Sequence, residues 1–324
     1  MSVAPPHKFR RHWAGLLLLS LSVCGASSLP ASGPQEAGQR ESPKISVSTN
    51  LVVLPVNVTD DRGRFVAGLK KEHFRVYEDG RLQAISLFVE EDSPVTVGLL
   101  VDHSGSMSPK LREVAAAVST FAASSNPQDE MFVVNFSDSV IVASFNGRAF
   151  TDKPQDLRNA ALAMSAGGRT ALYDAVAEGL KQVELGRRDK KALVIVSDGG
   201  DNASRRQYSQ VLAAARQAHA VIYSIGLVGS STEEENPRIL DRICKDTGGI
   251  AFLLHPGQGV AEVARLIAQD LREQYVIAYT PPKKPVGNAF RKVAVKVDAP
   301  EPGRIRVRTR TGYVARFADP PSAE

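Results

Sequence analysis

The hydrophobic positions between residues 94 and 270 follow two alternating periods. Short apolar runs, typical of strands buried on both faces, are followed by segments in which apolar residues recur every three or four positions, as on a helix face. We expect strands at 95–101, 131–136, 140–145, 191–197, 221–225 and 250–254. We expect helices at 110–125, 155–164, 171–184, 208–219, 260–272 and from Pro237 onward. This alternation predicts an α/β fold, a doubly wound and mainly parallel sheet with helices on both faces.

Strands with a period of two residues lie on both sides of this central segment. The expected strands are 51–58, 74–78 and 84–89 before it, and 274–280, 291–297 and 304–310 after it. Turn signals separate the first group at 59–63 and at 78–81, and the second signal is typical of a compact hairpin. Neither group can bury its apolar faces alone. We therefore expect the two groups to pair into one β-sandwich that is split by the α/β segment.

The first strand of the central segment runs directly into a cluster of oxygen-bearing side chains, Asp102, Ser104 and Ser106. Ligands of parallel sheets gather at the carboxyl ends of the strands, and this cluster lies at one. Thr170 follows two glycines at the start of a predicted helix, and Asp198 ends another apolar strand. Hydroxyls and water-bridged carboxylates suit Mg²⁺, which takes an octahedral shell of oxygens and gives up its waters reluctantly. Such an ion would keep much of its charge and an open position for an outside anion.

These five residues together resemble the metal-ion-dependent adhesion site of the von Willebrand factor type A domain, which has a Rossmann-like fold. The resemblance covers the whole α/β segment. It implies that the hydroxyls of Ser104, Ser106 and Thr170 contact the metal directly, and that Asp102 and Asp198 act through water. It also implies a protein partner whose Glu or Asp completes the metal shell beside Asp102 and the three hydroxyls. The expected ion is Mg²⁺ or Mn²⁺, with Ca²⁺ as a third alternative.

Simpler interpretations of the same residues exist. Ser104 and Ser106 could cap the helix that starts near Pro109, and Asp198 could begin a turn, but these roles leave the coincidence of three segments unexplained. His103 lies between the predicted ligands. Mg²⁺ disfavours imidazole, and the side chain of His103, one residue along from a ligand, points in another direction than the ligands do. We therefore expect His103 to be a packed or solvated histidine.

The amino terminus is typical of an export signal. Three basic residues precede the apolar stretch 13–23, which is too short for a comfortable membrane span and is followed by small residues. We therefore expect a periplasmic, cell-envelope or secreted protein. Cys24 lies in a stretch similar to a lipoprotein signal, so lipidation there, and membrane contact through the lipid, is an open alternative.

The predicted division of the chain has six parts. These are a signal peptide (1–28), a flexible linker (29–44), an amino-terminal β module (45–93), the type A domain (94–272), carboxy-terminal strands that pair with that module (273–316) and a disordered tail (317–324). The strand-rich leader, the tyrosine-containing segment 274–281 and a final Thr-Gly-Tyr at 311–313 resemble a group of exported bacterial proteins related to type A domains. That resemblance indicates the arrangement of domains more than it indicates a biochemical function.

Composition narrows the classes of function. The chain has 324 residues, 43% hydrophobic and 23% charged, which is ordinary for globular proteins. Its formal charge of +5 is small for this length, and it has no zinc-finger spacing, so nucleic acid is not an expected partner. Cys244, at a helical spacing from Leu240, is expected to be a buried structural thiol. It is the only cysteine left after signal removal, so no internal disulfide is expected.

The sequence does not predict an enzyme. Magnesium-dependent phosphotransferases commonly need a second carboxylate two residues after the attacking aspartate, where this chain has Ser104. No Ser-His-Asp order and no G-x-x-x-x-G-K-[ST] phosphate loop occurs, so no small-molecule substrate is expected. Two alternatives to an adhesion module remain: a structural envelope protein whose ion only stabilises loops, and a Mg²⁺-dependent phosphatase.

Two runs of like charge receive structural interpretations. Alternating arginines at 304–310 predict an edge strand with one solvated face, rather than a site for anionic lipid or polysaccharide. The glutamates at 233–235 precede Asn236 and Pro237, so we expect them to suit the positive end of a helix rather than to bind calcium.

Overall fold

The computed structural model of this protein describes residues 51–90, 93–229, 235–255, 257–281, 289–299 and 304–315. The predicted signal peptide, Cys24, the linker and the carboxy-terminal tail lie outside these residues, as do Glu233 and Glu234. In the described part of the chain, no helix is both long enough and apolar enough to cross a membrane.

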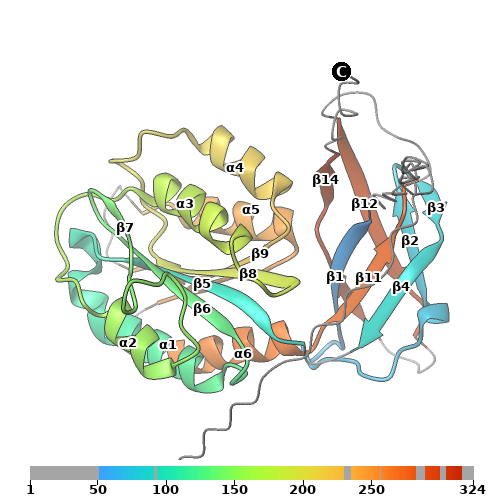
Figure 1. Ribbon diagram of the computed structural model, residues 1–324, viewed down its shortest axis with the longest axis horizontal. Helices are drawn as coiled ribbons and strands as arrows, with labels where there is room; N and C mark the ends of the chain where they lie inside the picture. Colours follow the sequence, from blue (N-terminus) through green and yellow to red (C-terminus); the bar gives the residue numbers. More distant parts are fainter. Residues whose placement is uncertain are drawn as a thin grey trace, which may run out of the picture. The chain divides into compact units, whose positions relative to one another are not determined.

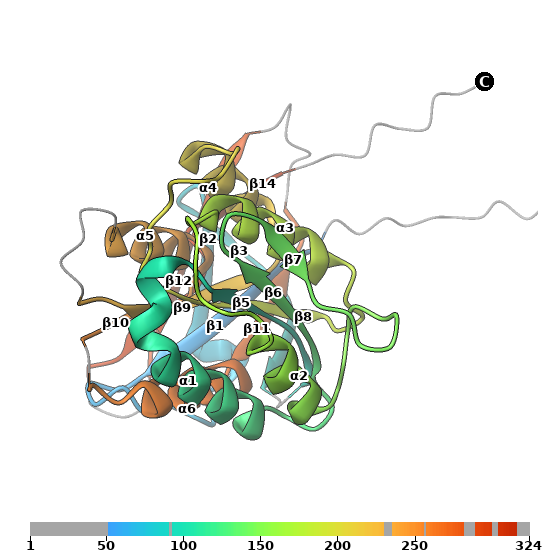
Figure 2. The same ribbon diagram turned by 90° about the vertical axis from the view of Figure 1, so that its left-hand side faces the viewer.

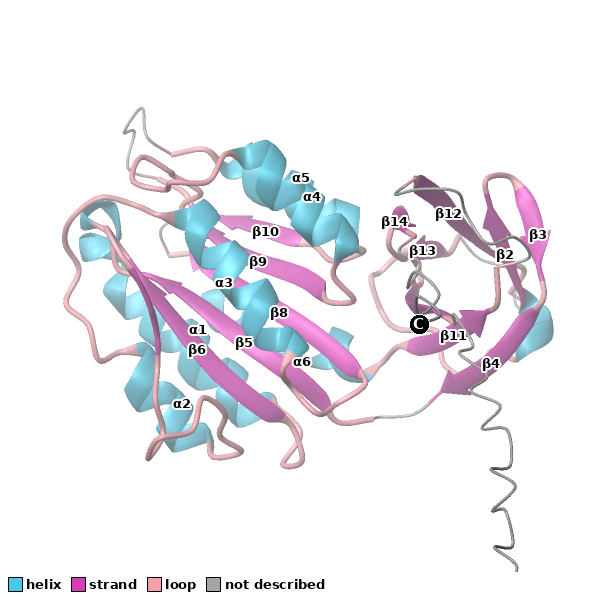
Figure 3. Cartoon of the chain, turned by 45° about the horizontal axis from the view of Figure 1, so that its top comes forward, coloured by secondary structure: helices cyan, strands magenta, loops and turns pink. Residues whose placement is uncertain are grey.

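A six-stranded sheet forms the centre of the α/β region, in the order β10-β9-β8-β5-β6-β7. The strands are β5 Val95–Asp102, β6 Glu130–Phe136, β7 Val140–Val142, β8 Lys190–Ser197, β9 Val221–Leu227 and β10 Ala251–Leu254. Five of them are parallel (Figure 3), and β7 is antiparallel to β6. Every residue of β5 is buried, as expected for a strand covered on both faces. The predicted doubly wound, mainly parallel sheet is confirmed.

Helices cover both faces of this sheet (Figures 1 and 2). One face carries α1 Leu111–Ser124, α2 Pro154–Ala161 and α6 Val260–Arg272, and the other carries α3 Leu172–Glu184, α4 Tyr208–Gln217 and α5 Pro237–Thr247. Each face has its own apolar core, with Phe121 and Ile267 in the first and Leu172 and Ile243 in the second. The two cores hold β5 rigidly between them, so its carboxyl end is a fixed platform for the residues that follow.

Two four-stranded antiparallel sheets contain the strands from both flanks, in the orders β13-β1-β11-β4 and β14-β12-β2-β3. The strands are β1 Val52–Thr59, β2 Phe74–Glu78, β3 Arg81–Gln83, β4 Ile85–Glu90, β11 Tyr275–Tyr279, β12 Phe290–Val297, β13 Arg306–Arg308 and β14 Gly312–Val314. β1 pairs with β11 and β13, and β2 pairs with β12. One apolar core joins both sheets and includes Leu54, Val76, Tyr275 and Val293. The predicted β-sandwich, built from strands before and after the α/β segment, is confirmed.

Tyrosines from the carboxy-terminal strands bind a buried glutamate on β2. Glu78 is 4% exposed, and its Oε2 accepts hydrogen bonds from the hydroxyls of Tyr279 (2.6 Å) and Tyr313 (2.8 Å). The guanidinium of Arg291 pairs with the other carboxylate oxygen. These contacts fasten β11, β12 and β14 to β2, so the tyrosines that suggested an architecture in the sequence have a structural role.

The arginine-rich strand differs from its prediction. β13 is an edge strand, as expected, but Arg308 on it and Arg310 just after it are not solvated. Arg308 pairs with Asp270 of α6 over 2.6 Å. Arg310 is 7% exposed, and its guanidinium donates to the backbone carbonyl oxygens of Arg216 and Gly312. Alternation along the strand predicted the edge correctly, but packing against helical segments covers the side that the pattern left polar.

The predicted helix 110–125 begins differently. A 3₁₀ helix, η2 Gly105–Lys110, precedes α1 and contains Pro109.

The hairpin signal at 78–81 is a two-residue turn between β2 and β3, with positive φ at Asp79 (46°) and Gly80 (80°). The short strand β3 was not predicted, because its three residues carry no periodic pattern.

Candidate functional site

The first loop of the candidate site begins where β5 ends. Asp102 is fully buried, and its Oδ1 accepts a hydrogen bond from the backbone N–H of Ser104 over 2.8 Å. Its Oδ2 accepts a hydrogen bond from Ser197 Oγ, at the end of β8, over 2.6 Å. The Oγ atoms of Ser104 and Ser106 lie 3.2 Å apart. Since Asp102 is fixed from two sides, the strand end holds the two hydroxyls next to each other.

The second loop carries Thr170 and is bonded to the first. The backbone N–H of Gly105 donates to the carbonyl oxygen of Gly168 over 3.0 Å, and that of Gly167 donates to the carbonyl oxygen of His103 over 2.7 Å. Gly168 has φ +78°, a left-handed conformation that favours glycine. Thr170 is 4% exposed. The glycines therefore let the Thr170 loop approach the backbone of the serine loop.

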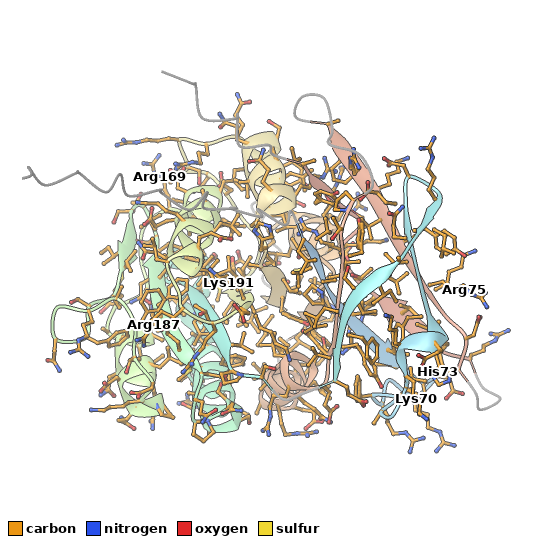
Figure 4. The ribbon with its side chains drawn as sticks, turned by 45° about the vertical axis from the view of Figure 1, so that its right-hand side comes forward. Lys70, His73, Arg75, Arg169, Arg187 and Lys191 are labelled. Carbon is orange, nitrogen blue, oxygen red and sulfur yellow. The ribbon has the colours of Figure 1, made fainter. Side chains whose placement is uncertain are left out.

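Arg169 forms the exposed rim of the second loop. Its Nε lies 3.0 Å from Asp138 Oδ1, and its side chain is 67% exposed. Hydrogen bonds from Arg169 lower the pKa of Asp138. Figure 4 shows Arg169 well apart from Arg187, which precedes β8 at the amino ends of the strands. A cationic side chain thus borders the candidate site at the carboxyl ends.

The third loop follows β8 and is bonded to the second. Asp198 is 1% exposed, and its Oδ1 accepts a hydrogen bond from the backbone N–H of Gly200 over 3.2 Å. The backbone N–H of Thr170 donates to Asn202 Oδ1 over 2.7 Å, and the backbone N–H of Asn202 donates to the carbonyl oxygen of Thr170 over 2.9 Å. The structure therefore brings all three predicted loops together.

Burial raises the pKa of Asp102 to about 6, and hydrogen bonds from Ser104 and Ser197 only partly oppose this effect. The negative charge of Asp198 raises the pKa of Asp102 further, because a nearby like charge disfavours ionisation. Two neighbouring buried carboxylates are costly unless a cation compensates them. This arrangement therefore attracts positive charge.

The donor set fits a hard divalent cation. Two carboxylates and three hydroxyls supply only oxygen ligands, and adjacent ligands of an octahedral Mg²⁺ shell lie about 3.0 Å apart, given metal–oxygen distances of about 2.1 Å. The 3.2 Å separation of Ser104 Oγ and Ser106 Oγ is near that spacing. Within the described residues, no group of three or more His, Cys, Asp or Glu side chains could hold a metal. Metal binding by Asp102, Ser104, Ser106, Thr170 and Asp198 therefore depends on the hydroxyls and stays a prediction.

Sequence reasoning missed a cation beside these residues. Lys110 Nζ lies 3.1 Å from Asp198 Oδ2 and 2.9 Å from Glu235 Oε1. Glu235 Oε2 in turn accepts a hydrogen bond from the backbone N–H of Gly229 over 3.2 Å. Glu235 thus pairs with Lys110, whereas the sequence suggested that it serves the start of α5. No local pattern signals this pairing, because 88 positions separate Lys110 from Asp198 and 125 separate it from Glu235.

His103 is a packed side chain, one of the two roles expected for it. It is fully buried, and its Nε2 lies 3.2 Å from Asn135 Oδ1 and 3.1 Å from the carbonyl oxygen of Ala161. Because both neighbours are acceptors, Nε2 carries the proton. Burial lowers the pKa of His103. Its ring nitrogen is therefore engaged with β6 and α2.

The sequence profile of the von Willebrand factor type A domain matches residues 97–261, slightly more than half of the chain. This range contains the five predicted ligands and Lys110. No curated protein matches the chain in sequence.

Several solved structures have a similar fold. A von Willebrand factor type A protein from Catenulispora acidiphila has a TM-score of 0.50 and 14% identity, over 83% of this chain and 75% of that one. The corresponding domain of the type V pili tip protein Mfa5 from Porphyromonas gingivalis has a TM-score of 0.45 and 13% identity, over 56% of this chain and 95% of that one. The pilus adhesin SpaC from Lactobacillus rhamnosus GG has a TM-score of 0.45 and 12% identity, over 81% of this chain and 47% of that one. The first of these structures supports the fold, and an identity this low supports nothing beyond it.

Proposed function

Because this chain belongs to the von Willebrand factor type A family, we propose that it is an exported protein-binding module that depends on a divalent metal. Mg²⁺ or Mn²⁺ is held by Asp102, Ser104, Ser106, Thr170 and Asp198, and a Glu or Asp side chain of a partner protein completes the shell. The proposal that the protein is exported rests on the predicted signal peptide (1–28). The function is binding rather than catalysis.

The observation that carries the proposal is the meeting of three separate loops at the carboxyl ends of β5 and β8. The bonds Gly105 to Gly168, Thr170 to Asn202 and Ser197 to Asp102 connect these loops in a closed set. A bound Mg²⁺ supplies a positive centre that attracts a carboxylate. The chain's own hydroxyls hold the ion without neutralising it, because a hydroxyl carries no formal charge.

The rim of the site supports an acidic partner. Arg169 lies directly before Thr170 and its side chain is mostly exposed. A partner carboxylate at the metal would therefore approach next to a guanidinium whose Nε is already paired with Asp138, so the rim adds a small contribution to association that is sensitive to ionic strength.

Calorimetric titration of the purified protein with MgCl₂ and MnCl₂ tests the metal site. We expect one divalent ion per chain, and Ser106→Ala should weaken the affinity about tenfold or more, since an inner ligand is lost. Ser108→Ala is the matched control, because Ser108 lies on the same 3₁₀ helix but is exposed. Absence of binding to the unmodified protein would refute the metal site.

A pull-down from envelope extract tests the adhesion role. The unmodified protein, Ser106→Ala and Ser108→Ala are immobilised, each with Mg²⁺ and with EDTA. Metal-dependent adhesion is supported by partners that the unmodified protein and Ser108→Ala retain in Mg²⁺. The same partners should be lost when EDTA is added, and Ser106→Ala should not retain them. Metal-dependent melting temperature combined with partner binding that ignores EDTA would instead show an ion that only stabilises the loops.

A further inference from the structure

Lys110 is a buried cation in contact with a predicted metal-site carboxylate. Its side chain is 9% exposed, and its ammonium bridges Asp198 and Glu235 over 3.1 and 2.9 Å. We propose that Lys110 is an internal counter-cation that competes with the divalent metal for Asp198 and so sets the metal affinity of the site. This inference rests on the proposed function, since it concerns the same site.

The position of Lys110 follows from the fold. The 3₁₀ helix η2 begins directly after Ser104, contains Ser106 and ends at Lys110, so one short segment carries two predicted ligands and the cation. Asp198 follows the neighbouring strand β8, and Glu235 directly precedes the Asn236 cap of α5. Lys110 therefore joins the ends of three elements that are distant in sequence.

The charges explain why Lys110 matters for metal binding. Asp102 and Asp198 are both buried, and Ser197, which directly precedes Asp198, donates a hydrogen bond to Asp102. The ammonium of Lys110 compensates Asp198, whereas no lysine or arginine contact with Asp102 appears among the described ion pairs. A divalent ion near Asp198 meets the positive charge of Lys110 at short range, and such repulsion is strong where burial excludes water. Lys110 thus lowers the affinity for the metal.

The same contact keeps the site assembled without metal. Lys110 links η2 to the third loop through Asp198, so the loops do not need an ion to stay together. Glu235 shares the ammonium and limits how strongly it binds Asp198. The result is a site that responds to divalent concentration instead of holding one ion permanently.

A simpler alternative is that Lys110 only stabilises the fold as one member of a satisfied buried ion pair. The two interpretations predict different changes in metal affinity when Lys110 is replaced. If Lys110 is only structural, replacing it leaves the metal affinity unchanged or weakens it through loosened loops. If Lys110 competes with the metal, replacing it with a neutral side chain strengthens metal binding even though the metal-free protein becomes less stable.

The experiment compares Lys110→Met with the unmodified protein by calorimetric titration with MnCl₂ and by melting temperature with and without MnCl₂. We expect Lys110→Met to bind Mn²⁺ at least about tenfold more tightly than the unmodified protein. It should melt at a lower temperature without metal, and its melting temperature should rise more when MnCl₂ is added. Lys110→Arg keeps the charge and should bind Mn²⁺ like the unmodified protein. Lys181→Met is the matched control for loss of a cation, because Lys181 lies on α3 with its side chain 69% exposed.

A second variant covers the case in which Lys110→Met does not fold. Glu235→Gln removes the carboxylate that shares the ammonium, so Lys110 binds Asp198 more strongly and Mn²⁺ affinity should fall severalfold. Unchanged affinity in Glu235→Gln, or unchanged or weaker affinity in folded Lys110→Met, would overturn the inference. If the unmodified protein binds no Mn²⁺ at all, the proposed function fails as well, and the two failures are thereby distinguished.

Discussion

At the scale of single residues, surroundings decide chemistry. Cys244 is fully buried on α5, and burial raises the pKa of its thiol to about 12. Helical spacing from Leu240 predicted that Cys244 is buried, and the structure confirms it. The thiolate is the reactive form of cysteine, so a thiol with this pKa is inert near neutral pH.

We therefore predict that Cys244 resists alkylation by iodoacetamide at pH 8 in the native protein and reacts readily in 6 M guanidinium chloride. Mass spectrometry of the peptide that contains Cys244 measures both. Native labelling as fast as that of the denatured chain would show that α5 opens frequently.

At the scale of elements, contacts between strands distant in sequence hold the β-sandwich together. Glu78 on β2 receives hydroxyl hydrogen bonds from Tyr279 on β11 and Tyr313 on β14. The apolar alternation predicted the strands, but it did not predict that their tyrosines meet at one carboxylate. Buried carboxylates require such donors, because an unsatisfied one costs more than the hydrogen bond it loses.

Tyr279→Phe should lower the free energy of unfolding by about 1–3 kcal/mol, because Glu78 loses one of its donors in a buried site. Urea denaturation followed by circular dichroism measures the change. Tyr77→Phe is the control: Tyr77 lies next to Glu78 on β2, is half-buried, and its hydroxyl has no described hydrogen bond. A loss of equal size in both variants would mean that Glu78 is not the reason.

At the scale of the whole molecule, buried groups with raised pKa values link stability to pH. Burial raises the pKa values of Cys244 and Tyr275 to about 12. Each pKa in the folded state exceeds its value in the unfolded chain, so the folded chain keeps protons that the unfolded chain releases. The resulting stabilisation is complete below about pH 9 and is lost as pH rises toward 12.

We predict that the free energy of unfolding falls between pH 9 and pH 11, with each such group contributing a slope of up to about 1.4 kcal/mol per pH unit. Urea denaturation at a series of pH values measures the slope. Cys244→Ala should make the slope shallower, because one of the titrating groups is removed. A slope that is the same in both proteins would show that Cys244 does not contribute.

Much of the fold and part of the candidate site could be predicted from sequence. Apolar strands and amphipathic helices are local patterns, so the parallel sheet and its helices followed from them. The residues of two of the three loops were recognisable because strong strand signals lie directly beside them: Asp102 ends β5 and Asp198 follows β8. The two glycines before Arg169 marked the loop that carries Thr170. The pairing of Lys110 with Asp198 and Glu235 was not predictable, because lysine is usually solvated and nothing near it marks a buried partner.

Residue order alone was sufficient for the fold class, for the edge position of β13 and for the grouping of oxygen-bearing side chains at the ends of two strands, since each depends on neighbours within a few residues. Only tertiary packing decided which charges share a buried space. It placed Lys110 on Asp198, Arg308 on Asp270 and two tyrosines on Glu78. The reason is physical: a charge loses its water when distant segments close over it, and its partner must come from whichever segments those are.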